Sequence, residues 1–88
     1  MPTLAMFYGI LIRMFKEDHS RHKQPHIHAK YNEYEAVYSL HGELMEGELP
    51  SKQHKLVVAW VALHEDELAA DWELISAGEP FFKIKPLD

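Results

Sequence analysis

The segment His26–Leu40 constrains the fold most, because its residues alternate in polarity on both sides of a short turn signal. Asn32-Glu33 marks the turn, since asparagine tolerates the left-handed backbone that two-residue hairpin turns require. Pairing Tyr31 with Tyr34 across this turn sorts the side chains onto two faces. The predicted core face carries Ile27, Ala29, Tyr31, Tyr34, Ala36 and Tyr38, and the polar face carries His26, His28, Lys30, Glu35, Val37 and Ser39.

Further strands are predicted on both sides of this hairpin. Residues 6–15 are rich in aromatic and β-branched side chains on both alternating faces, which predicts a single central strand. A turn at His41-Gly42 leads into a shorter strand over residues 44–49, whose glutamates are typical of a sheet edge. The first half of the chain therefore predicts an antiparallel β-meander of about four strands.

The second half of the chain predicts helix. Residues 51–77 contain neither glycine nor proline, and Ser51 suits the N-cap position at the start of this stretch. The polar residues 64–67 interrupt the apolar pattern, which predicts one broken helix or two helices. Trp60 and Trp72 are assigned to the core, as large aromatic residues at helical spacing usually are. The expected solvated helix face holds Glu65, Asp66, Glu67, Asp71 and Glu73.

Length and composition bound the class of protein. The 88 residues predict one domain, residues 1–88, of the α+β class, with the meander packed against the C-terminal helical segment. The chain contains no cysteine, which removes disulfides and thiolate metal ligands and fits a reducing compartment. We find no basic leader and no stretch of about 18 apolar residues. We therefore expect a cytoplasmic protein that does not span a membrane.

The charge of the chain is unevenly distributed. Its formal net charge of −5 disfavours broad binding to nucleic acid, which requires a basic surface that displaces counterions. Residues 13–30 nevertheless hold five lysine or arginine residues and four histidines. A local basic face on an acidic protein is therefore compatible with this sequence.

His26 and His28 are the main candidates for chemistry. On a strand both imidazoles point to the same side, with Cα atoms about 6.5–7 Å apart. Two such rings can act as general acid and base, while Arg13 and Lys30 stabilise negative charge on a phosphate. This set suits metal-independent RNA cleavage, provided that Arg13 lies on the same sheet face as the histidines. Tyr31 is a secondary candidate, since the predicted register points it to the core.

Two other interpretations of the histidines stay open. Both rings can be ordinary half-exposed strand residues without a chemical role. Alternatively, His26 and His28 bind zinc or another divalent transition metal. A stable site of that kind requires three or four ligands, and His19 from the preceding loop is the candidate third ligand.

Short motifs along nearly the whole chain carry a family resemblance. They are Phe7-Tyr8-Gly9-Ile10, Ile12-Arg13-Met14, Asp18-His19, Pro25-His26-Ile27-His28-Ala29-Lys30-Tyr31, Glu46-Gly47-Glu48-Leu49-Pro50 and Trp72-Glu73. Together they resemble a small bacterial family, the domain of unknown function DUF4160. The family pattern carries over onto Arg13, His19, His26, His28 and Tyr31.

The resemblance implies a partner and an activity. Members of the family are often encoded beside another small protein, an arrangement that resembles a toxin–antitoxin pair. The expected partner is therefore a small cognate protein encoded nearby, and the expected function is a toxin-like component that acts on RNA through its histidine-bearing strand. The alternatives are a non-catalytic module whose acidic surface binds a basic partner, and a small histidine-ligated metal-binding protein.

Overall fold

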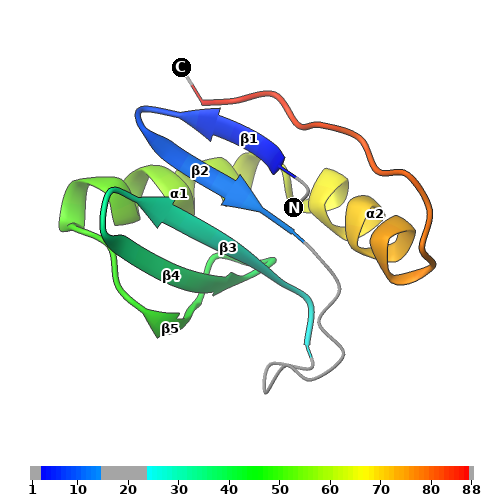
Figure 1. Ribbon diagram of the computed structural model, residues 1–88, viewed down its shortest axis with the longest axis horizontal. Coiled ribbons are helices and arrows are strands. Elements are labelled where there is room, and N and C mark those ends of the chain that lie inside the picture. The colour runs from blue at the N-terminus through cyan, green and yellow to red at the C-terminus, as the bar shows by residue number, and fades with distance from the viewer. Residues whose placement is uncertain (1–2, 15–23, 88) are drawn as a thin grey trace.

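The computed structural model of the chain describes residues 3–14 and 24–87. In this part of the chain, a five-stranded antiparallel sheet is followed by two helices, which confirms the predicted α+β class. The strands follow chain order in the sheet, and both helices lie behind one of its faces (Figure 1). The elements are β1 (Thr3–Phe7), β2 (Ile10–Arg13), β3 (His26–Tyr31), β4 (Tyr34–Ser39), β5 (Leu44–Gly47), α1 (Ser51–Leu63) and α2 (Glu65–Ser76).

The segment predicted as a single central strand forms two strands instead. β1 and β2 pair antiparallel across a two-residue turn at Tyr8-Gly9, whose φ angles are 49° and 79°. Two successive left-handed residues reverse the chain, and glycine adopts this conformation without Cβ strain. The apolar pattern runs through the turn on both sides, so it does not mark the reversal. The sheet therefore has five strands rather than about four.

The β3–β4 hairpin has the predicted register. Tyr31 pairs with Tyr34, and Asn32 has the left-handed φ of 52° that the turn requires. The predicted core face is buried at Ile27 and Tyr38, which are fully covered. The opposite face is less exposed than its polar composition suggests, because it also buries His26, Val37 and Ser39.

The two helices meet at His64, as the polar interruption in the sequence predicted. The predicted cap is wrong by one residue, because Pro50 occupies the N-cap and Ser51 is the first helical residue. Trp60 is fully buried, and its ring centroid lies 5.5 Å from that of Phe7 in β1. α1 thus supplies the largest side chain of the core. Neither helix in the described residues is long and apolar enough to cross a membrane.

Asp71 is buried rather than solvated, which corrects the sequence-based assignment. Only 2% of its surface is exposed, and its Oδ1 accepts a hydrogen bond from the Phe82 backbone N–H at 3.0 Å. The segment after α2 also packs on the sheet, where the Ile84 N–H donates to the Leu4 carbonyl at 3.0 Å. Burial raises the pKa of Asp71, although the Phe82 hydrogen bond lowers it, and the charge of Glu67 adds to the increase.

We expect Asp71→Asn to remove a pH-dependent part of the stability. Folding raises the pKa of Asp71 above its ordinary value of 3.8. The contribution of protonated Asp71 to the free energy of unfolding is therefore complete below pH 3.8 and is lost as the pH rises through the pKa of the folded state. The stability of the variant relative to the natural chain should therefore increase as the pH rises above about 4, measured by urea unfolding at a series of pH values. Asp66→Asn, on the exposed part of α2, is the control. A relative loss by Asp71→Asn over this range would contradict the prediction.

Candidate functional site

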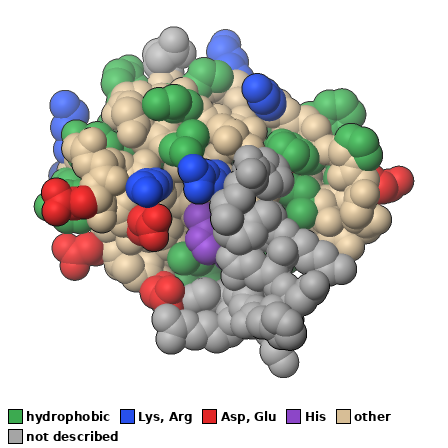
Figure 2. All heavy atoms as spheres, viewed as in Figure 1, with side chains coloured by type: hydrophobic (Ala, Val, Ile, Leu, Met, Phe, Trp, Pro, Cys, Tyr) green, Lys and Arg blue, Asp and Glu red, His purple; other side chains and the backbone are tan. Residues whose placement is uncertain are grey.

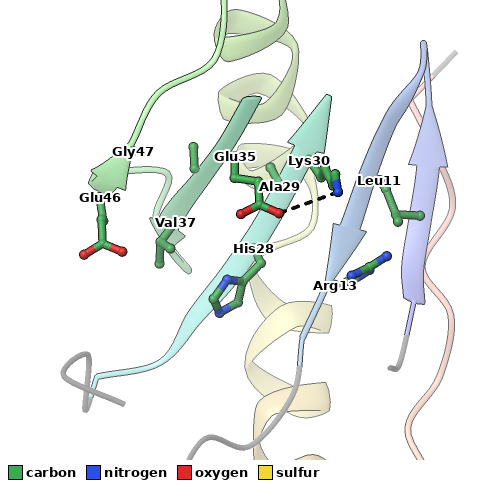
Figure 3. A pocket seen from close by; sticks show the side chains of 10 residues that line it. Leu11, Arg13, His28, Ala29, Lys30, Glu35, Val37, Glu46 and Gly47 are labelled. Atoms are coloured by element: carbon green, nitrogen blue, oxygen red, sulfur yellow. Dashed lines mark ion pairs between the residues drawn. The ribbon is translucent and has the colours of Figure 1, made fainter. Parts of the chain in front are cut away.

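The candidate residues lie on the face of the sheet that is turned away from the helices, called the open face below. β2 supplies Arg13, and β3 supplies His28 and Lys30, while the helices lie behind the sheet (Figure 3). Arg13 pairs directly with His28, and Val37 pairs with Glu46. Because His28 also pairs with Val37, a single row of side chains crosses four strands. This register places Arg13 on the same face as His28, as the RNA-cleavage hypothesis required.

The open face contains a hollow of about 320 Å³. Its charges are segregated, with Arg13 and Lys30 on β2 and β3 and with Glu35 and Glu46 on β4 and β5 (Figure 3). The Lys30 Nζ atom lies 3.8 Å from the Glu35 Oε1 atom, and both side chains are largely exposed. Figure 2 shows a histidine in the middle of this surface, with basic and acidic side chains beside it. The hollow therefore offers cations to an anionic group and carboxylates to hydrogen-bond donors.

The two strand histidines occupy different environments. His28 is half-buried and lines the hollow, whereas His26 is only 1% exposed. The His26 Nδ1 lies 2.9 Å from the Gln24 carbonyl oxygen, and because a carbonyl only accepts hydrogen bonds, this nitrogen carries a proton. The half-exposed interpretation is therefore wrong for His26.

Ring contacts connect His26 to the helix layer and to His28. The centroid of the His26 ring lies 5.4 Å from that of Trp72 in α2 and 5.1 Å from that of His28, which it meets nearly edge-on. Trp72 thus packs against His26, which in turn contacts His28.

The other predicted site residues lie apart from this group. Tyr31 is half-buried on the core face, where its ring would approach a Cβ atom at Gly9 to 3.3 Å. His19 lies outside the described residues. Among the residues that are described, no group of three or more histidine, aspartate or glutamate side chains is placed to hold a metal ion. In the described part of the chain, the predicted metal ligands are therefore limited to the His26 and His28 rings.

Sequence reasoning did not single out Glu35, Glu46 or Gly47 as site residues. Glu35 was placed on the correct face by the hairpin register, but Glu46 was interpreted only as an edge charge. Gly47 has a φ of 74°, and a Cβ atom there would lie 2.2 Å from the Glu35 carbonyl oxygen. Because Gly47 has no side chain, β5 can approach β4 closely at this point. Gly47 itself lines the hollow.

Gly47→Ala is expected to lower the free energy of unfolding by about 2–3 kcal/mol, because the new Cβ atom meets backbone at a position that is already strained for alanine. Gly78→Ala is the matched control. Gly78 also has a φ of 74°, but no atom lies within 4 Å of the site of its Cβ atom. Urea unfolding of both variants should therefore show the larger loss for Gly47→Ala. Equal losses would mean that the contact with Glu35 has no energetic consequence.

Comparison with known proteins gives one family. A family model described as a domain of unknown function, DUF4160, matches residues 9–73. The match extends from the β1–β2 turn into α2 and includes Arg13, His28 and Lys30. No curated protein and no solved structure gives a significant match.

Proposed function

The chain belongs to the DUF4160 family, and we propose that it is the toxin-like component of a bacterial two-protein module and cleaves single-stranded RNA at its open face. One observation carries the proposal, namely the direct pairing of Arg13 with His28 on a sheet face that the helices leave uncovered (Figure 1). A guanidinium binds a phosphodiester well, and an imidazole beside it can move a proton at neutral pH. The resemblance of family members to one half of a toxin–antitoxin pair supports the two-protein arrangement.

RNA carries its own nucleophile for this reaction. The 2′ hydroxyl attacks the adjacent phosphorus, and a 2′-oxygen–phosphorus bond forms as the bond to the 5′ oxygen breaks. His28 accepts the proton of the 2′ hydroxyl, and water supplies a proton to the departing 5′ oxygen. Arg13 and Lys30 stabilise the charge that develops on the phosphate oxygens. The products are a 2′,3′-cyclic phosphate and a 5′ hydroxyl.

His26 has a positioning role in this mechanism. Its burial keeps it away from a substrate in the hollow, and its Nδ1 proton is directed to the Gln24 carbonyl. The edge-on contact with His28 makes His26 a support for the reacting imidazole. The two histidines therefore divide the work between proton transfer and orientation, instead of sharing acid and base roles.

Induced expression in bacteria tests the proposal. We expect the natural chain to arrest growth and the Arg13→Gln/His28→Gln variant to leave growth unaffected at the same soluble level. His41→Gln/Lys52→Gln is the matched control, because it removes one exposed histidine and one exposed cation away from the open face and should still cause arrest. Purified natural chain should leave 2′,3′-cyclic phosphate ends on labelled RNA. Absence of both arrest and cleavage with the natural chain would refute the proposal.

A second candidate function, a partner-binding module, has an observation of its own. α2 carries the exposed carboxylates Glu65, Asp66, Glu67 and Glu73 and contains no lysine or arginine. Such a helix is complementary to a basic segment of a partner protein. If binding is the only function, the Arg13→Gln/His28→Gln variant should retain full affinity for the cognate protein, and the natural chain should leave RNA intact.

A further inference from the structure

Tyr8 occupies a backbone position that is unusual for its residue type. Together with Gly9 it forms the turn between β1 and β2, and its φ angle of 49° lies in the left-handed region. Turns of this kind favour asparagine, aspartate or glycine at the first position, because a bulky side chain is strained there. The chain therefore keeps an aromatic residue where a smaller one would make a better turn.

The side chain of Tyr8 is largely exposed at the tip of the hairpin. Tyr8 is 59% exposed, whereas its neighbours Phe7 and Ile10, which pair across the turn, are buried. Within the described parts of the chain, the structure records neither a hydrogen bond nor a ring contact for Tyr8. A largely exposed aromatic residue thus occupies a strained backbone position, a combination found where a residue serves binding.

The tip of the hairpin lies beside the cationic half of the open face. Leu11 follows the turn by two residues and pairs with Lys30 of β3. Arg13 lies further along β2, three residues or about 10 Å beyond Ile10, the first residue after the turn. An exposed aromatic ring next to a short cationic surface is the combination with which proteins bind single-stranded nucleic acid.

We infer that Tyr8 stacks on a nucleobase of the RNA strand whose phosphate lies at Arg13 and His28. This inference rests on the proposed function and adds a base contact to the phosphate contact. Arg13 and Lys30 bind the backbone, and Tyr8 fixes a nearby base. Stacking tolerates every base, since each has an aromatic face, so Tyr8 increases affinity without selecting a sequence.

The variant Tyr8→Asn tests this role, because asparagine suits the turn and removes the ring. Binding is measured by fluorescence anisotropy with a labelled 2′-O-methyl oligoribonucleotide of about ten nucleotides. This probe cannot be cleaved, because methylation blocks the 2′ oxygen that would attack the phosphorus. We expect Kd to rise about 5- to 150-fold, while the midpoint of urea unfolding stays equal or rises. Tyr8→Phe keeps the ring and should bind like the natural chain. Phe82→Asn removes an exposed aromatic residue beside α2 and should also leave Kd unchanged.

The outcomes separate the inference from the proposed function. If the natural chain binds and cleaves RNA and Tyr8→Asn has the same Kd, Tyr8 is only a turn residue and the inference is wrong. Weaker binding together with a lower unfolding midpoint for Tyr8→Asn would also overturn it, because the ring would then act by holding the hairpin. If the natural chain neither binds nor cleaves RNA, the proposed function fails first, and the stacking role fails with it.

Discussion

Replacing Trp60 by alanine is expected to lower the free energy of unfolding by about 3–5 kcal/mol. Trp60 is the largest fully buried side chain in the described residues. Its ring packs on Phe7, and its indole N–H donates a hydrogen bond to the Lys85 carbonyl at 2.9 Å. The substitution therefore removes contacts of α1 with β1 and with the C-terminal segment at once, and it leaves a cavity between them.

The expected loss is large for a chain of this size, because a domain of 88 residues has a total stability of about 4–13 kcal/mol. Urea unfolding monitored by circular dichroism measures this loss of stability, because the signal does not depend on the fluorescence of Trp60. Leu63→Ala is the control, since Leu63 ends the same helix but is 68% exposed, and its change should stay within about 0.5 kcal/mol. A loss below about 1 kcal/mol for Trp60→Ala would contradict the prediction.

The register of the β3–β4 hairpin could be predicted because its information is local. Apolar and polar residues alternate along β3, so a shift of register by one residue would expose Ile27 and Tyr38. Asn32 adds an independent turn signal that agrees with this register. The break at His64 is also local, because a polar run interrupts the apolar pattern of the helices.

The errors arose where distant residues decide the structure. At Tyr8-Gly9, the first turn residue is not a turn former, and strands on both sides are apolar, so composition indicated one long strand. Asp71 follows Leu68 by three residues and lies on the buried side of α2, where the segment around Phe82 covers it. Docking of that segment depends on tertiary packing, which the local pattern of α2 does not contain.

The candidate site was predictable only in part. Alternation placed His28 and Lys30 on one face, but it could not distinguish His26 from His28, because Trp72 of α2 covers only the first ring. The proximity of Arg13 to His28 depends on which strands are neighbours in the sheet. Glu46 comes to the same face by the pairing of β5 with β4, after the sequence had suggested only an edge strand.

Within the proposed function, His28→Gln is expected to lower kcat for RNA cleavage by about 100- to 10,000-fold, the range that a general acid or base contributes. Glutamine retains hydrogen-bonding groups but cannot accept the proton of the 2′ hydroxyl, so KM should change little. Lys30→Gln should instead raise KM, because Lys30 contacts the phosphate on the partly exposed side of the hollow. Single-turnover and steady-state cleavage of a labelled oligoribonucleotide measure both constants.

His26→Phe separates orientation from proton transfer in the same assay. Phenylalanine keeps an aromatic ring between Trp72 and His28, but it removes the bond from Nδ1 to the Gln24 carbonyl and every titratable group. A positioning role predicts a loss of kcat below about 10-fold, with the pH profile of the natural chain retained. If His26→Phe lost as much activity as His28→Gln, His26 would itself transfer a proton. The buried ring would then have to reach the substrate through a rearrangement of β3.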